Sequence, residues 1–288
     1  MLAPRQILFT SVDDLLSHAS GKTWESAGDC LQEVSRRRVP LILCTRGTRA
    51  ELDSARRKLG HSHPFLTEGG RGLFIPDGYF NLRLEGADRC GRNFCVPFAK
   101  PTAEAATALA EIAEECGASV VGLSQMSVRE ISSNCGLTAR DAELYRQREF
   151  GELFFFAGET EATTKQFSEI AREKGWQAVS GSPFWELRAP LKHHGDNAVH
   201  YLMNVYHKTL RGRQRCVGIG STEDDLYYLS AMDAAVILPR RASEFDSGLL
   251  ARLPKAHQAE LGGIDGWCKA IAEQIAPQSN LREGGVKH

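Results

Sequence analysis

The sequence predicts an α/β fold with a parallel sheet, because short apolar runs typical of buried strands alternate with amphipathic helical segments. Two further observations support this class. The first apolar runs end in polar residues, as expected where the carboxyl ends of buried strands meet solvent. The alternation also stops near residue 84 and resumes near residue 198, which predicts one sheet built from both ends of the chain.

The first third of the chain contains two predicted strand–helix pairs. The run from Ile7 to Val12 predicts a strand, and residues 24–38 show a helical pattern that ends in arginines, where cations stabilise a helix terminus. Leu41–Cys44 predicts the second strand, which continues through a Thr-Arg-Gly-Thr turn into a helix over residues 49–59. Ligand sites in such folds form at the carboxyl ends of the strands.

The middle of the chain has a different pattern, which predicts an inserted α+β domain. We therefore expect a core domain made of residues 1–84 and 190–288, and a cap domain made of residues 85–189. The cap is expected to contain a helix over 103–116 and strands over 120–123 and 153–157. In the last third we expect helices over 198–210 and 224–231 and strands over 216–219 and 234–238.

Composition narrows the function classes. Of the 288 residues 42% are hydrophobic and 25% are charged, and the formal net charge of -1 provides no overall field to attract nucleic acid or anionic lipid. No apolar stretch is long enough to span a bilayer, so we expect no membrane association. The eight cysteines contain no C-x-x-C pair, which favours reduced thiols and a cytoplasmic location.

Four segments in chain order resemble one known family. They are Ser11-Val12-Asp13-Asp14-Leu15, LILCTRGTRAEL from Leu41, TEGGRGLFIPDGYF from Thr67 and REFGELFF from Arg148. Together they resemble the mannosyl-3-phosphoglycerate phosphatase branch of the HAD superfamily, and the resemblance runs from about Ile7 to about Leu238. It implies a HAD-like, Rossmannoid core with a parallel sheet and an inserted α+β cap of type IIB.

The resemblance also implies a chemistry. A family member uses an aspartate nucleophile, a second carboxylate as acid/base, Mg²⁺, and a threonine and a lysine that hold the phosphoryl group. Carried over residue by residue, the catalytic positions are Ser11 (nucleophile), Asp13 (acid/base), Thr45 (phosphate) and Lys192 (a possible replacement lysine). The substrate-binding positions are Arg46, Gly69, Gly70, Arg148 and Glu149, and the metal positions are Asp13, Ser221, Glu223 and Asp225.

Three of these positions depart from the family pattern. Serine stands at the nucleophile position, neither His194 nor Gly195 supplies the lysine of the third motif, and Ser221 replaces the first aspartate of the acidic loop. Removal of a nucleophile alone costs on the order of 10⁴ to 10⁶ in rate. We therefore predict lost or strongly reduced phosphatase activity, with a cleft between core and cap that still binds a small phosphorylated sugar or glycerate.

Simpler interpretations and other functions remain open. Asp13 with its neighbour is compatible with a turn, Thr45 with a cap of the following helix, and the acidic run 223–225 with a helix first turn. One alternative function is an active Mg²⁺-dependent phosphomonoesterase that uses Asp13 and Glu223. Another is a non-catalytic interaction subunit.

Overall fold

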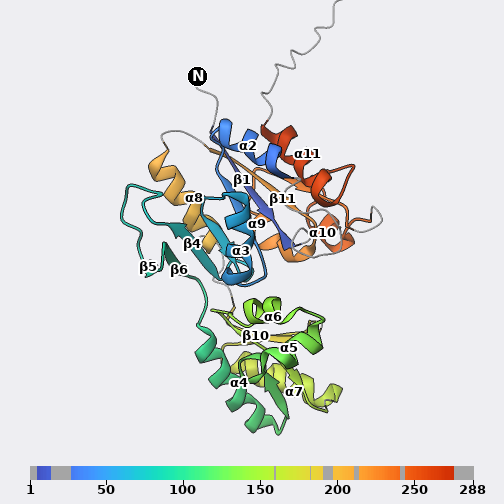
Figure 1. Ribbon diagram of the computed structural model, residues 1–288. Coiled ribbons are helices and arrows are strands. Elements are labelled where there is room, and N and C mark those ends of the chain that lie inside the picture. Colours follow the sequence, from blue (N-terminus) through green and yellow to red (C-terminus); the bar gives the residue numbers. More distant parts are fainter. Residues whose placement is uncertain are drawn as a thin grey trace, which may run out of the picture.

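The structure of the protein is a computed structural model that describes residues 5–13, 27–158, 160–181, 183–190, 197–210, 214–240 and 244–275. In Figure 1 the chain forms a larger core, coloured blue and orange to red, above a smaller cap, coloured green to yellow. Both ends of the sequence contribute to the core, and the middle of the sequence forms the cap. This arrangement places the loops at one edge of the core next to the cap.

A nine-stranded sheet forms the centre of the core within the described ranges, in the order β13-β12-β11-β1-β2-β3-β4-β6-β5. The strands from β13 to β3 are parallel, and β4, β6 and β5 continue the sheet in antiparallel fashion. Pairing of β1 with both β11 and β2 confirms that the first and last thirds share one sheet. The strands are β1 Arg5–Ser11, β2 Leu41–Cys44, β3 Phe65–Thr67, β4 Gly72–Pro76, β5 Asp88–Cys90, β6 Asn93–Pro97, β11 Gln214–Gly220, β12 Ala234–Ile237 and β13 His257–Gln258.

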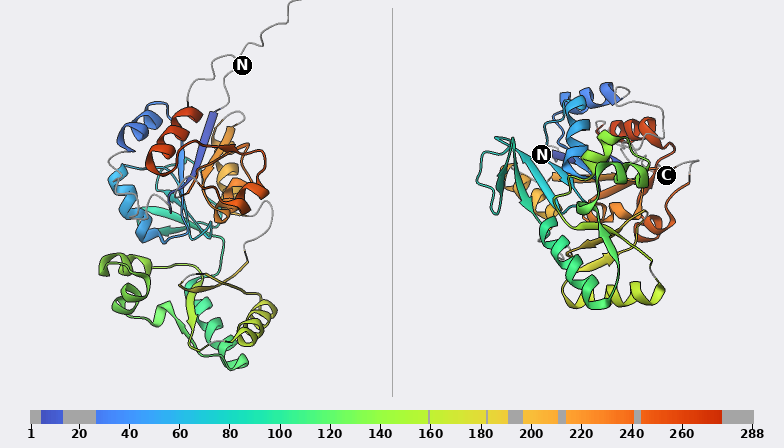
Figure 2. Two further views of the ribbon diagram at one scale, coloured as in Figure 1. Left: turned by 90° about the vertical axis from the view of Figure 1, so that its right-hand side faces the viewer. Right: turned by 60° about the horizontal axis from the view of Figure 1, so that its bottom comes forward.

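Helices cover both faces of this sheet, because successive side chains of a strand point to opposite sides. Leu8 of β1 packs in the layer that contains Trp267, whereas Phe9 packs in the layer that contains Leu202. The left view of Figure 2 shows α2 and α11 on one side and the orange helices on the other. The helices are α2 Gly28–Arg36, α3 Arg49–Leu59, α8 Ala198–Thr209, α9 Leu226–Leu229, α10 Ser247–Arg252 and α11 Gly263–Ile275, with the 3₁₀ turn η4 Glu223–Asp225 before α9.

Helix α3 shows how local sequence sets an element. The Thr48 hydroxyl accepts a hydrogen bond from the Glu51 backbone N–H, and the Glu51 carboxylate accepts one from the Thr48 backbone N–H, which forms a capping box. Gly60 ends the helix in the left-handed conformation, with φ of 61°. The predicted helix over 49–59 and the predicted strand over 41–44 both agree with the structure.

The cap is an α+β unit, as predicted. Among the described residues it has an antiparallel sheet in the order β7-β8-β10-β9. Helices α4 and α7 pack on this sheet around Phe154 and Phe167, and α5 and α6 belong to a second cluster around Ile131. Its elements are α4 Thr102–Cys116, β7 Val120–Gly122, η3 Leu123–Gln125, α5 Val128–Cys135, α6 Ala139–Tyr145, β8 Glu152–Phe156, α7 Glu161–Glu173, β9 Gln177–Val179 and β10 Trp185–Arg188.

The sheet of the core extends further along the chain than the expected boundary at residue 84. Strand β6 pairs with β4 from Gly72 opposite Pro97 to Pro76 opposite Asn93, and β5 pairs with β6. Residues 88–97, which we expected in the cap, therefore belong to the core sheet. A half-exposed antiparallel hairpin at a sheet edge lacks the continuous apolar run of a buried parallel strand. The sequence pattern therefore did not predict that residues 88–97 belong to the core sheet.

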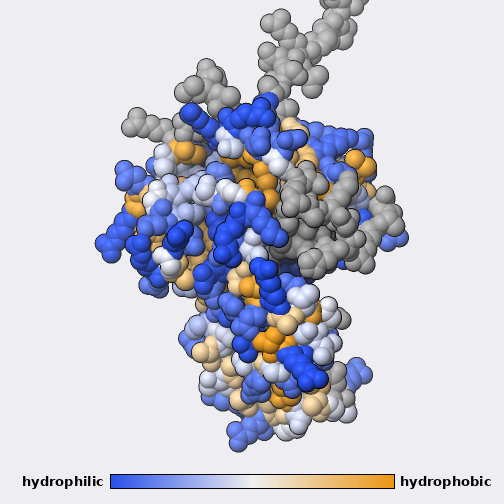
Figure 3. Space-filling model, in the orientation of Figure 1, coloured by the Kyte–Doolittle hydropathy of each residue, from blue (hydrophilic) through white to orange (hydrophobic). Residues whose placement is uncertain are grey.

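The described surface is mainly polar. Figure 3 shows a largely hydrophilic face with small apolar areas. Within the described part of the chain, no helix has the length and apolar character that a bilayer crossing requires.

Candidate functional site

Three neighbouring strands, β1, β2 and β11, end at the same edge of the core sheet. Ser11 is the last residue of β1 and lies opposite Cys44, the last residue of β2. The backbone N–H of Ser11 donates to the Tyr228 hydroxyl at 3.0 Å, and that hydroxyl donates to the Ile219 carbonyl at 2.7 Å. Tyr228 of α9 is fully buried, so its hydroxyl fixes the end of β1 at Ser11 relative to the neighbouring strand β11.

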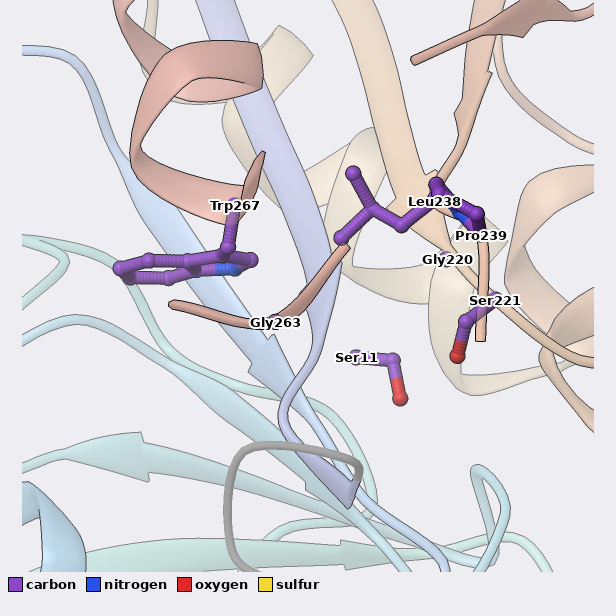
Figure 4. A pocket seen from close by; sticks show the side chains of 7 residues that line it. All are labelled: Ser11, Gly220, Ser221, Leu238, Pro239, Gly263 and Trp267. Carbon is purple, nitrogen blue, oxygen red and sulfur yellow. The ribbon is translucent and has the colours of Figure 1, made fainter. Parts of the chain in front are cut away.

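Ser11 and Ser221 line the same small cavity, of about 20 Å³, which is shown in Figure 4. This volume corresponds to roughly one water molecule. The lining residues are Ser11, Gly220, Ser221, Leu238, Pro239, Gly263 and Trp267. The indole of Trp267 donates to Thr10 at 2.7 Å, which holds the ring beside β1. The structure thus brings together the expected nucleophile and metal positions, and both are serines.

Asp13 lies beyond the end of β1 and contacts the loop that follows β2. Its carboxylate accepts hydrogen bonds from the Thr45 hydroxyl, from the Arg46 backbone N–H at 3.0 Å and from Arg46 Nε at 3.1 Å. The Arg46 guanidinium also pairs with Asp224 in η4. Thr45 is buried and does not cap α3, since Thr48 fills that role. The residues Asp13, Thr45 and Arg46 therefore meet at one place.

Asp225 faces inward and closes the turn after β11. It is 3% exposed, and its carboxylate accepts from the backbone N–H groups of Ser221 at 2.8 Å and Thr222 at 3.2 Å. Burial raises the pKa of Asp225 to about 7, although hydrogen bonds from Ser221, Thr222 and the Ser11 side chain act in the opposite direction. Glu223 is exposed and lies against Gly248 of α10. The acidic run thus contains one structural carboxylate (Asp225), one that pairs with Arg46 (Asp224) and one that lies against α10 (Glu223).

These residues do not fit the divalent cation that the resemblance implies. Ser11 and Ser221 offer only neutral hydroxyl groups, and the carboxylates of Asp13 and Asp224 are held by Arg46. Mg²⁺ is bound in proteins mainly through carboxylate oxygens. Among the described residues, no group of three or more His, Cys, Asp or Glu side chains is arranged to hold a metal ion. Lys192, with His194 and Gly195, lies outside the described residues.

The glycines after β3 form a tight left-handed turn. Glu68, Gly69 and Gly70 have φ values of 50°, 65° and 83°. A Cβ on Gly70 would lie 2.8 Å from the Tyr227 ring, so this position needs glycine for packing against α9 as well as for its conformation. Contact of Gly69 and Gly70 with a substrate remains a proposal.

Arg148 and Glu149 join the cap to the core. The buried Glu68 carboxylate accepts from the backbone N–H groups of Glu149 at 2.8 Å and Phe150 at 3.1 Å, and it pairs with Arg148 at 3.3 Å. Arg148 also pairs with Glu186 of β10 at 3.2 Å, and Glu149 pairs with Arg49 of α3 at 3.0 Å. Burial raises the pKa of Glu68 to about 6, and Arg148 opposes that rise. Both predicted substrate-binding side chains thus hold the cap against the core.

Asp224, which pairs with Arg46, belongs to the acidic run 223–225 that the sequence indicated. The sequence did not indicate two other residues that shape the site: Tyr228 holds Ser11, and Glu186 completes the ion network of Arg148. No local pattern marks such side chains, because each acts through a partner from a distant segment. For Tyr228 the separation is 217 residues.

Comparison with known proteins gives a consistent result at the level of fold and sequence. No family model matches the chain. The chain is 27% identical to a glucosyl-3-phosphoglycerate/mannosyl-3-phosphoglycerate phosphatase of Methanococcoides burtonii, over 96% of this chain and 100% of that protein. A protein of the same description from Persephonella marina is 26% identical, with 92% and 95% covered. The solved structure of a HAD subclass IIB sugar phosphatase superposes with a TM-score of 0.59 at 14% identity, with 94% and 100% covered.

The parallel core sheet and the inserted α+β cap define the class of fold. The chain has the fold of a HAD subclass IIB sugar phosphatase. Its sequence is similar over nearly its whole length to two glucosyl-3-phosphoglycerate/mannosyl-3-phosphoglycerate phosphatases, at 27% and 26% identity.

Proposed function

We propose that this protein binds a phosphorylated sugar or glycerate derivative where the strand ends of the core meet the cap, and that its phosphatase activity is lost or strongly reduced. The observation that carries this proposal is Ser11 at the end of β1, beside Ser221 in the same cavity. The two positions where the family's chemistry needs carboxylates hold neutral side chains.

The chemistry of serine explains the expected loss. A hydroxyl group is a weak nucleophile without an adjacent base, whereas a carboxylate attacks phosphorus readily and forms an acyl phosphate that water can hydrolyse. A phosphoserine ester would be far more stable than an acyl phosphate. Asp13 is also held by the Thr45 hydroxyl and by Arg46, and the carboxylate that the described part of the chain places next to Ser11 is the inward-facing Asp225.

The ligand class follows from the relatives and from the charges at this edge. The names of two full-length relatives specify glucosyl- and mannosyl-3-phosphoglycerate as their substrates. In this chain Arg46 presents a guanidinium that is 51% exposed at the strand ends, and it bonds the same Asp13 carboxylate as the Thr45 hydroxyl. A half-exposed guanidinium beside a hydroxyl group suits a phosphate dianion. The cap contacts the same loops, because its Leu144 carbonyl accepts from the Thr48 hydroxyl and its Glu149 N–H donates to the Glu68 carboxylate.

One assay tests this proposal. Purified protein with Mg²⁺ is incubated with mannosyl- or glucosyl-3-phosphoglycerate, and phosphate release is compared with that of the Methanococcoides burtonii relative. We expect phosphate release to be slower than that of the relative by a factor on the order of 10⁴ or more. We also expect the same compounds to raise the thermal stability of the protein. The matched variant is Ser11→Asp, which restores the carboxylate alone. Release comparable to that of the relative would refute the proposal.

A second function is favoured by one contact. Asp13 lies against Thr45, so a carboxylate is present at the expected phosphate loop, and this fits an active Mg²⁺-dependent phosphomonoesterase that uses Asp13 and Glu223. The variants Asp13→Ala and Glu223→Gln distinguish the two functions. Release that both substitutions abolish would establish the second function, whereas a low rate that neither substitution lowers supports the first.

A further inference from the structure

The geometry points to an anion site made by Thr45 and Arg46 that needs no divalent cation, because Arg46 takes the cation's place and the Asp13 carboxylate is a resident anion that a ligand phosphate displaces. The ligand class is a phosphate or phosphomonoester dianion. The inference deepens the proposed function and rests on it for the identity of the ligand. It differs from that function in specifying how the charge is balanced.

The first observation is the set of donors around Asp13. Its Oδ1 accepts from the Thr45 hydroxyl, and its Oδ2 accepts from the Arg46 backbone N–H at 3.0 Å and from Arg46 Nε at 3.1 Å. A hydroxyl group, a backbone amide at a strand-to-helix turn and a guanidinium together are a set of donors suited to a phosphate oxyanion. In this structure an internal carboxylate receives all of them.

The second observation is that the other donors of this loop are already used. The Gly47 N–H donates to Thr45 Oγ1 at 2.9 Å, and the Thr48 N–H donates to the Glu51 carboxylate at 2.7 Å. The Thr45 N–H bonds the Leu66 carbonyl at 3.0 Å. A phosphate arriving at this loop therefore has to use the donors that hold Asp13. Binding of the ligand and binding of the Asp13 side chain are mutually exclusive.

The third observation concerns the position of the Arg46 side chain. Its guanidinium pairs with both Asp13 and Asp224, which follow the neighbouring strands β1 and β11. A cation between two carboxylates at the strand ends is the charge arrangement that a bound metal ion would otherwise provide. Added Mg²⁺ would have to compete with a permanently charged guanidinium for the same oxygens, with like charges in close proximity.

The experiment measures inorganic phosphate affinity by calorimetry, in EDTA and in Mg²⁺. Asp13→Asn keeps the shape of the side chain and removes its charge, so we expect phosphate to bind at least about tenfold more tightly than to the wild type. Mg²⁺ should not change either affinity, and Arg46→Met should reduce binding to background. The control Asp77→Asn makes the same charge change in an exposed ion pair with Arg89, remote from the site, and should leave the affinity unaltered.

Two outcomes would overturn the inference: phosphate affinity in Asp13→Asn no tighter than in the wild type, or binding that requires Mg²⁺. Asp224→Asn provides a second variant if Asp13→Asn is unfolded by circular dichroism. It frees one side of Arg46, and phosphate binding should tighten by a smaller factor. The inference and the proposed function can fail separately. If Asp13→Asn and Asp224→Asn leave inorganic phosphate binding unchanged while glycosyl-phosphoglycerate still stabilises the protein, the resident-anion site is refuted and the proposed function is left intact.

Discussion

His61 is a residue whose environment keeps it neutral. Its Nε2 lies 2.7 Å from the Leu41 carbonyl, and its Nδ1 lies 3.1 Å from Arg56 Nε, so the ring donates through one nitrogen and accepts through the other. Burial lowers the pKa of His61 to about 3, and the charge of Arg56 adds to that effect. A protonated ring would lose the hydrogen bond that it accepts from Arg56.

The pH dependence of stability follows from this shift. Between about pH 6.5 and pH 3 the unfolded chain takes up a proton at His61 that the folded chain does not, so the free energy of unfolding falls as the pH falls. We expect His61→Gln to remove this loss, by on the order of 1 kcal/mol per pH unit below pH 6.5. Urea unfolding from pH 7.5 to pH 4.5 measures it. His257→Gln, on the exposed strand β13, is the control, and an equal drift in both variants would contradict the assignment.

Helix α3 is the element that connects the site to the cap. The Thr48 hydroxyl accepts from the Glu51 N–H at 3.2 Å and donates to the Leu144 carbonyl of α6 at 2.8 Å, and Thr48 is fully buried. The Thr48 side chain thus caps helix α3 and also donates to a backbone carbonyl of the cap domain. Helix α3 begins at Arg49, so the capping box at Thr48 also helps to position the backbone of Arg46, which precedes it.

Replacement of this cap should cost more than replacement of an ordinary one. Thr48→Ala removes both hydrogen bonds of the Thr48 hydroxyl and leaves the Leu144 carbonyl with the Gln147 N–H at 3.1 Å as its remaining donor, so we expect a loss of about 2 kcal/mol in the free energy of unfolding. Thr160→Ala is the matched control, because Thr160 caps α7 in an exposed position and its hydroxyl bonds the N–H and the hydroxyl of Thr163 on the same helix. Its expected cost is about 1 kcal/mol. Equal costs in denaturant unfolding would show that the contact with Leu144 contributes nothing.

At the scale of elements, prediction succeeded where an element is buried on a regular pattern. The helix over 49–59 and the strand over 41–44 follow from local spacing and from Gly60. The hairpin of β5 and β6 was assigned to the wrong domain, because only its pairing with β4 identifies it as part of the core sheet. Backbone pairing partners at a sheet edge are set by tertiary structure and not by a side-chain pattern.

The whole molecule depends on a buried ion network between core and cap. Arg148 has an exposed fraction of 7% and bonds both Glu68 of the core and Glu186 of the cap. Arg71 of the core donates to the Glu68 carbonyl at 2.7 Å and lies 4.0 Å from Glu186. The cap is therefore held in one position relative to the strand ends, which keeps Arg46 and Thr45 beside it.

Removal of the central cation should be strongly destabilising. Arg148→Met removes the ion-pair partner of the buried Glu68 carboxylate and one partner of Glu186, which keeps Arg188 at 2.9 Å, and we expect a loss of roughly 3 kcal/mol in the free energy of unfolding. Arg89→Met, in the exposed pair with Asp77, is the control and should cost less than about 1 kcal/mol. The double variant Glu68→Gln/Arg148→Met should recover part of the loss. A cost for Arg148→Met no greater than that of the control would exclude this role.

The sequence by itself determined the class of fold, the order of most elements and the presence of serine at positions 11 and 221. These are local properties, set by hydrophobic period and by the order of motifs. Only the tertiary structure decided that Arg46 lies between Asp13 and Asp224, because the Arg46–Asp224 contact joins residues that are 178 positions apart in the sequence. It also decided that Arg148 holds the cap. The physical reason is that the partner of a charged side chain depends on which strands lie side by side, and no local sequence pattern encodes that neighbourhood.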